Sequence, residues 1–141
     1  VDKAYNRVLN LLARRARSEW EISDYLKRKG YDETTSASVL GQVKERGYVD
    51  DLEFAKAWVA NRRLLKSVSK RRLSQELRQK RVADDIVNQV LEEDETDELE
   101  VLRELVERKK SRYPDRLKFM QYLVRQGFNY DAIKTVLEEK Y

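Results

Sequence analysis

Three segments of the chain repeat one pattern of capping and apolar positions, and this repetition constrains the fold more than any other feature. Each copy begins with a residue type that caps helices, and an apolar residue and a leucine follow at intervals of four. The copies read Ser18, Ile22, Leu26; then Ser69, Leu73, Leu77; then Asp115, Phe119, Leu123. Residues spaced by four lie on one face of a helix. The pattern therefore predicts the same amphipathic helix three times.

Each of these helices stands between two further stretches of helical periodicity. The preceding stretches cover residues 4–15, 52–66 and 96–112, and the following ones carry apolar pairs near residues 39, 90 and 136. We therefore predict an all-α fold of three tandem three-helix repeats, at residues 4–49, 50–93 and 96–141. The repeats should form an elongated, curved solenoid-like array, in which stacked neighbours complete the small core of each unit.

Residue types at the expected helix ends refine this prediction. Gly30 and Gly127 follow the central helices of the first and third repeats, where a left-handed residue commonly ends a helix. Arg81 occupies the equivalent position in the second repeat, and we expect that helix to end differently. Thr96 is the expected N-cap of the helix that opens the third repeat.

Composition excludes several classes of function. The chain has no cysteine and no histidine, which removes disulfides, cysteine nucleophiles, histidine acid–base catalysis and the usual zinc sites. The paired carboxylates at residues 50–51 and 84–85 could bind Mg²⁺, but both pairs fall at predicted helix starts, where acids stabilise the helix. We expect no catalytic residues, no cofactor and no metal, and therefore not an enzyme. Without an apolar run of about 18 residues or a signal peptide, we expect a soluble, cytoplasmic monomer that does not contact membranes.

The distribution of charge gives the clearest functional signal. Residues 62–81 hold nine basic residues and one acid, whereas residues 84–107 hold eleven acids and one arginine. Cations in the first turn of a helix oppose its dipole, so local stability does not explain the basic run at residues 70–72. We interpret the segment as a surface for an anionic partner, either phosphate or acidic protein. The candidate partner- or DNA-binding residues are Arg62, Arg63, Lys66, Lys70, Arg71, Arg72, Arg78, Lys80 and Arg81. Alternatively, the basic and acidic blocks are solvated helix faces that pair with each other.

Two segments resemble the RecX family of regulatory proteins. In the second repeat the matching residues are Asp50, Asp51, Phe54, Ala55, Trp58, Arg62, Arg72, Leu73, Glu76 and Leu77. In the first repeat they are Arg14, Arg17, Ser18, Glu21, Leu26, Gly30 and Tyr31. The family usually has glycine near residue 67 and a small residue followed by isoleucine near residues 81–82, and this chain departs from it there.

The resemblance implies three tandem three-helix repeats and a function. It implies that the protein binds RecA and the RecA filament on single-stranded DNA, and inhibits recombinase, ATPase and coprotease activities without being an enzyme. It would thereby modulate DNA repair and the SOS response. Two alternatives stay open from the residues alone: a basic helical-repeat module that binds single- or double-stranded DNA directly, and a helical-repeat adaptor for an unrelated protein.

Overall fold

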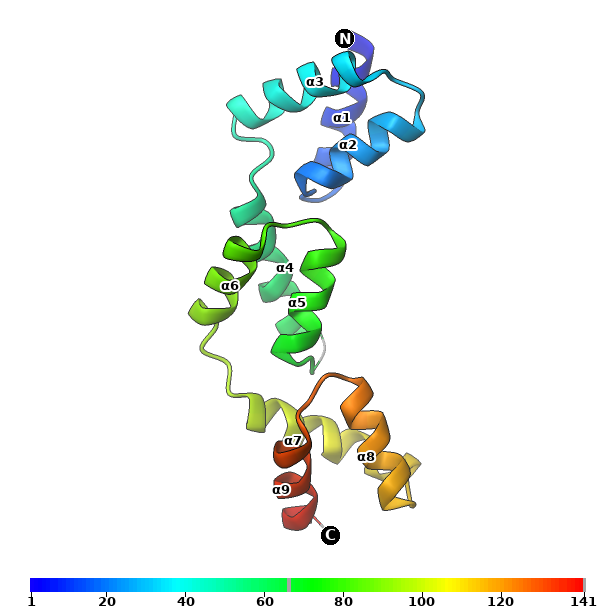
Figure 1. Ribbon diagram of the computed structural model, residues 1–141, viewed down its shortest axis with the longest axis vertical. Coiled ribbons are helices and arrows are strands. Elements are labelled where there is room, and N and C mark those ends of the chain that lie inside the picture. Colours follow the sequence, from blue (N-terminus) through cyan, green and yellow to red (C-terminus); the bar gives the residue numbers. More distant parts are fainter. Residues whose placement is uncertain (66, 141) are drawn as a thin grey trace.

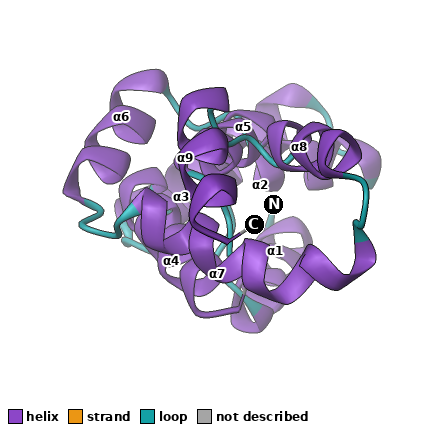
Figure 2. Cartoon of the chain, turned by 90° about the horizontal axis from the view of Figure 1, so that it is seen from below, coloured by secondary structure: helices purple, strands orange, loops and turns teal. Residues whose placement is uncertain are grey.

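The computed structural model describes residues 1–65 and 67–140, and this part of the chain contains helices and loops but no strand (Figure 2). The helices are α1 (Asp2–Arg14), α2 (Glu19–Arg28), α3 (Glu33–Glu45), α4 (Asp51–Leu65), α5 (Lys70–Gln79), α6 (Asp84–Glu93), α7 (Glu98–Lys109), α8 (Arg116–Arg125) and α9 (Tyr130–Lys140), with a 3-10 turn, η1 (Lys110–Arg112), after α7. Three three-helix repeats follow one another along the long axis, and the two termini lie at opposite ends (Figure 1). The all-α prediction of three tandem repeats is confirmed. None of the described helices combines the length and apolar character needed to cross a membrane.

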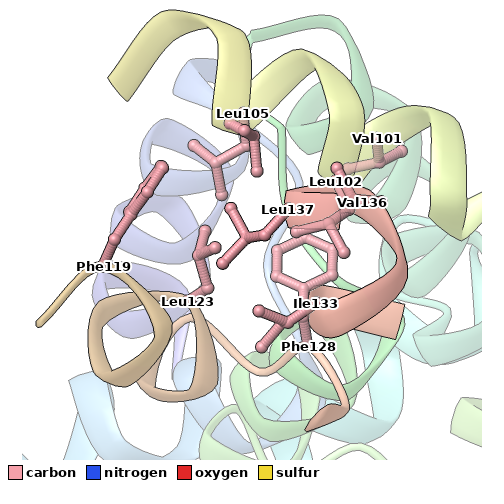
Figure 3. Packing of buried hydrophobic residues seen from close by; sticks show 10 residues of the cluster. Val101, Leu102, Leu105, Phe119, Leu123, Phe128, Ile133, Val136 and Leu137 are labelled. Carbon is pink, nitrogen blue, oxygen red and sulfur yellow. The ribbon is translucent and has the colours of Figure 1, made fainter. Parts of the chain in front are cut away.

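Each repeat has a hydrophobic core of its own. In the third repeat, Val101 and Leu102 of α7, Phe119 of α8, and Ile133 and Leu137 of α9 are almost fully buried and point toward one another (Figure 3). Separate clusters form in the first repeat, around residues 4–49, and in the second, around residues 54–90. The expectation that stacked neighbours complete each core is therefore wrong. Because the three helices of one repeat enclose their own apolar faces, the junctions between repeats are left to other contacts.

The central helix of every repeat ends in the same way. Gly30 and Gly127 have φ of +89° and +98°, as expected for left-handed residues at helix ends. Arg81 also has a positive φ, +61°, so the prediction of a different helix end in the second repeat is wrong. The N–H of Val82 donates to the carbonyl of Leu77 (3.2 Å), and equivalent bonds of 3.1 and 3.3 Å close the other two helices. The arginine thus adopts a conformation that usually favours glycine.

Helix α7 begins one residue later than its predicted cap implies. The carboxylate of Asp97 accepts a hydrogen bond from the N–H of Leu99 (3.0 Å), whereas the hydroxyl of Thr96 donates to Asp94 (2.8 Å). Asp97, rather than Thr96, is the N-cap. The predicted helix start at residue 50 is confirmed, because the Asp50 carboxylate accepts the N–H of Leu52 (3.0 Å).

Candidate partner-binding surface

The predicted binding residues lie in the middle of the molecule and reach both junctions between repeats. We refer to residues 62–81, from the end of α4 through α5, as the basic segment. Helices α2, α5 and α8 follow one another along one side of the molecule (Figure 1). The C-terminal end of the basic segment meets the first repeat, and its N-terminal half meets the third. One candidate, Lys66, lies outside the described residues.

The junction between the first and second repeats joins the start of α2 to the end of α5. The hydroxyl of Ser18, the buried N-cap of α2, donates to the carbonyl of Lys80, the C-cap of α5 (2.9 Å). The N–H of Glu19 donates to the carboxylate of Asp51 (2.9 Å), and the ammonium of Lys80 lies 3.3 Å from a carboxylate oxygen of Glu21. The positive end of one helix dipole therefore faces the negative end of another, which stabilises both.

Aromatic rings complete this junction. The guanidinium of Arg81 lies over the ring of Trp20, 5.8 Å from the ring centroid, and Trp20 is 39% exposed. The ammonium of Lys80 lies 5.7 Å from the centroid of Trp58, whose indole N–H donates to Glu76 (3.0 Å). Lys80 and Arg81 thus both make cation–π contacts, and Lys80 also pairs with the carboxylate of Glu21.

The junction between the second and third repeats has two hydrogen bonds that match those of the first. The hydroxyl of Ser69, the buried N-cap of α5, donates to the carbonyl of Gln126, the C-cap of α8 (3.0 Å). The N–H of Lys70 donates to the carboxylate of Glu98 (2.9 Å), in the same way that the first residue of α2 is capped by the first residue of α4. A guanidinium N–H of Arg72 donates to the side-chain carbonyl of Gln126 (3.2 Å).

Arg63 ties the same junction to the acidic connection before α7. Its guanidinium lies 2.8 Å from Asp94 and 3.2 Å from Glu98, and it also donates to the carbonyl of Val68. The ammonium of Lys70 donates to the carbonyl of Asp94 (3.0 Å). Burial is the largest single influence on the pKa of Asp94 and would raise it, but the hydrogen bonds and charge of Arg63 and the hydrogen bonds from Thr96 together lower that pKa. These cations stabilise the junction as well as carrying charge.

The remaining candidates divide between internal ion pairs and solvent. Arg62 binds Glu76 through two hydrogen bonds of 2.9 and 2.7 Å, and Arg78 lies 3.2 Å from Asp84. Both pairs lie inside the second repeat. Arg71 is exposed and has no ion-pair partner among the described residues. Of the described candidates, Arg71 therefore has the greatest freedom to meet an external anion.

The basic segment is thus not one continuous stripe of free cations. Two of its charges, Arg63 and Arg78, pair with carboxylates of residues 84–107, as the pairing alternative predicts. Sequence reasoning missed the second role of Ser18 and Ser69, which appeared only as helix caps. It also missed Arg108 and Lys109 of α7, which line one hollow at the second junction together with Arg62 and Arg72 of the basic segment. The sequence shows that these two cations stand near the end of a predicted helix, but only the fold shows that they lie beside the basic segment. Partner contact by the nine candidates stays a prediction.

Comparison with known proteins follows the same division into repeats. The models of the first, second and third three-helix domains of RecX match residues 4–42, 50–91 and 95–137, respectively. A regulatory protein RecX of Amycolatopsis mediterranei is 34% identical over 98% of this chain and 83% of its own length. One from Vibrio campbellii is 31% identical over 92% of this chain and 86% of its own.

The fold gives the same result. The crystal structure of RecX from Lactobacillus salivarius superposes with a TM-score of 0.82 at 25% identity, over 98% of this chain and 94% of that one. All three repeats, in the same order, therefore have counterparts in one family. The chain belongs to the RecX family of regulatory proteins.

Proposed function

We propose that this protein binds RecA and the RecA filament on single-stranded DNA and inhibits its ATPase, strand-exchange and coprotease activities. In this way it would modulate DNA repair and the SOS response in the cytoplasm. The observation that carries the proposal is membership of the RecX family through all three repeats. The family resemblance implies RecA as the partner, and the relatives are named regulatory proteins.

The architecture supports a mode of action by contact rather than by chemistry. A rod of repeats, each with its own core and joined by specific hydrogen bonds, presents a long surface in a defined geometry (Figure 1). Such a surface can span neighbouring protomers of a helical polymer. Inhibition would then be stoichiometric, because each bound molecule blocks only the protomers it touches.

Within this rod we propose Arg71 as a contact of the basic segment with the filament. The residue is exposed on the first turn of α5, and no described carboxylate neutralises it. Since the other described members of the segment bind groups of this chain, changing them would alter the rod itself. Arg71 can be changed without that complication.

The test is the rate of ATP hydrolysis by RecA on single-stranded DNA as this protein is added. We expect the rate to fall in proportion to the added protein and to level off near a fixed ratio to RecA. Arg71→Glu should require more protein for the same inhibition. Lys134→Glu, an equal change of charge at an exposed site on α9, is the matched control. An unchanged rate at several-fold molar excess of the unaltered protein would overturn the proposal.

A further inference from the structure

A cationic hollow lies at the junction between the second and third repeats, next to the bond from Ser69 to Gln126. Its volume is about 280 Å³. Four cations line it: Arg62 and Arg72 from the second repeat, and Arg108 and Lys109 from the end of α7. Tyr122 and Gln126 of α8 supply polar groups to the same lining. We call it the junction hollow.

The charge of the junction hollow is only partly balanced. No carboxylate belongs to its lining. Glu76 binds Arg62 at 2.7 Å and lies 3.7 Å from Arg72, so one acid serves two arginines. Arg108 and Lys109 have no ion-pair partner among the described residues, and Arg108 is exposed. Cations gathered in one concave site repel one another, which favours an anion between them.

The other junction offers an internal comparison, because a similar hollow of about 330 Å³ lies beside Ser18 and Lys80. That hollow is lined by two carboxylates, Glu21 and Asp24, among its cations. The difference can be followed residue by residue from the N-cap serines. The residue three positions after the serine is Glu21 in the first repeat and Arg72 in the second. The residue seven positions before it is Leu11 in the first repeat and Arg62 in the second.

The geometry of the junction is therefore repeated, while its charge is not. Both serines make the same bond to the C-cap carbonyl of the next central helix. A requirement of the fold would apply to both junctions alike. At one junction alone, two arginines replace a carboxylate and an apolar side chain and share a single carboxylate, Glu76, which leaves an excess of positive charge there.

We propose that the junction hollow binds a phosphate group, from either a nucleotide or a nucleic-acid backbone. Guanidinium groups match the oxygens of phosphate through paired N–H donors, and lysine adds a point charge. The Tyr122 hydroxyl and the Gln126 amide can donate to the remaining oxygens. The inference does not require RecA, because it rests only on the lining of this hollow.

Binding of pyrophosphate, ADP and a short oligothymidylate to the protein alone, measured by calorimetry at low salt, tests the proposal. The key variant is Arg108→Glu, since this exposed residue can change without breaking an ion pair among the described residues. We expect it to weaken binding about tenfold or more, as for the loss of a charged hydrogen bond. Arg108→Gln should weaken it less, and Lys134→Glu, which changes the net charge equally, should leave it nearly unchanged.

The three probes also separate the possible sources of the phosphate. Binding of ADP and pyrophosphate that exceeds binding of the oligonucleotide would identify a nucleotide site, and the reverse order would identify a nucleic-acid backbone site. Either result supports the proposal when Arg108→Glu weakens the binding and Lys134→Glu does not. No binding of any probe, or equal weakening by Arg108→Glu and Lys134→Glu, would overturn it. Because RecA is absent from the assay, neither outcome depends on RecA inhibition.

Discussion

Replacing Gly127 with alanine should destabilise the protein more than the same replacement at Gly30. Both glycines end a central helix, with φ of +98° and +89°. Their surroundings differ. A Cβ at Gly30 would meet nothing within 4 Å, whereas a Cβ at Gly127 would overlap the hydroxyl oxygen of Ser69 and lie 3.4 Å from the backbone nitrogen of Arg72. Gly127 therefore has two roles: it adopts the positive φ that ends the helix, and it leaves space for the Ser69 hydroxyl at the junction.

The expected cost divides into two parts. A left-handed alanine costs roughly 1–2 kcal/mol at either site. At Gly127 the Ser69 hydroxyl must also move, which breaks its bond to Gln126 (3.0 Å) and its cap of the Arg72 N–H (3.1 Å). A buried hydrogen bond and an N-cap are each worth about 1 kcal/mol. We therefore expect about 3–4 kcal/mol for Gly127→Ala and about 1–2 kcal/mol for Gly30→Ala.

Urea unfolding followed by circular dichroism measures both losses, and a double mutant isolates the contact. In the Ser69→Ala background the hydroxyl is gone, and the nearest remaining side-chain atom, the Cβ of residue 69, lies 3.5 Å from the new Cβ. Gly127→Ala should then cost no more than Gly30→Ala. Equal losses for the two single variants, or an unchanged cost of Gly127→Ala without the hydroxyl, would refute the reasoning.

Three further variants test the helix end and the charges at the junctions. Arg81→Gly should be more stable than Arg81→Ala by about 1 kcal/mol in urea unfolding, because φ is positive there; a more stable alanine variant would contradict this. Burial raises the pKa of Asp51, so its ionised form costs stability once the pH exceeds that pKa. Asp51→Asn, which can still accept the Glu19 N–H, should be at least as stable as the parent at pH 7, and the difference should fade on acidification. Burial would raise the pKa of Asp94, but Arg63 and Thr96 together lower it, so its contribution is present above the unfolded pKa and lost as the pH falls through the folded one. Asp94→Asn should therefore be less stable at pH 7, and the gap should begin to close as the pH falls below about 4 and vanish only below the lowered pKa of Asp94. A gap that does not depend on pH would rule out the ionic explanation for either aspartate.

The helices and their order could be predicted because the signals are local. An apolar face repeats every three or four residues, and a capping residue stands within three residues of the N–H it binds. The same locality explains the errors. Arg81 breaks the glycine pattern, yet its helix ends normally, with a guanidinium that lies over Trp20 of another repeat. Thr96 and Asp97 are both capping residue types, and their neighbours in the chain do not decide between them.

The contacts of the basic segment could not be predicted, because its partners lie far away in the sequence. Ser69 binds a carbonyl 57 residues away, and Arg63 binds carboxylates 31 and 35 residues away. The composition of the segment indicated an anionic partner, and left open whether that partner was another molecule or the acidic block of the same chain. Only the fold shows that much of this charge belongs to the chain itself, and that Arg108 and Lys109 join Arg62 and Arg72 at one hollow.

The two kinds of contact at the junctions have different consequences for experiments in salt. The bonds from Ser18 and Ser69 to backbone carbonyls are neutral, and both serines are fully buried, so dissolved ions do not screen them. The ion pairs around them are partly exposed and weaken as salt rises. Because a buried neutral bond persists at each junction, the geometry of the rod should change little over the range of salt that abolishes phosphate or filament binding. The salt dependence of binding then measures the contacts with the partner, and not a change in the shape of this protein.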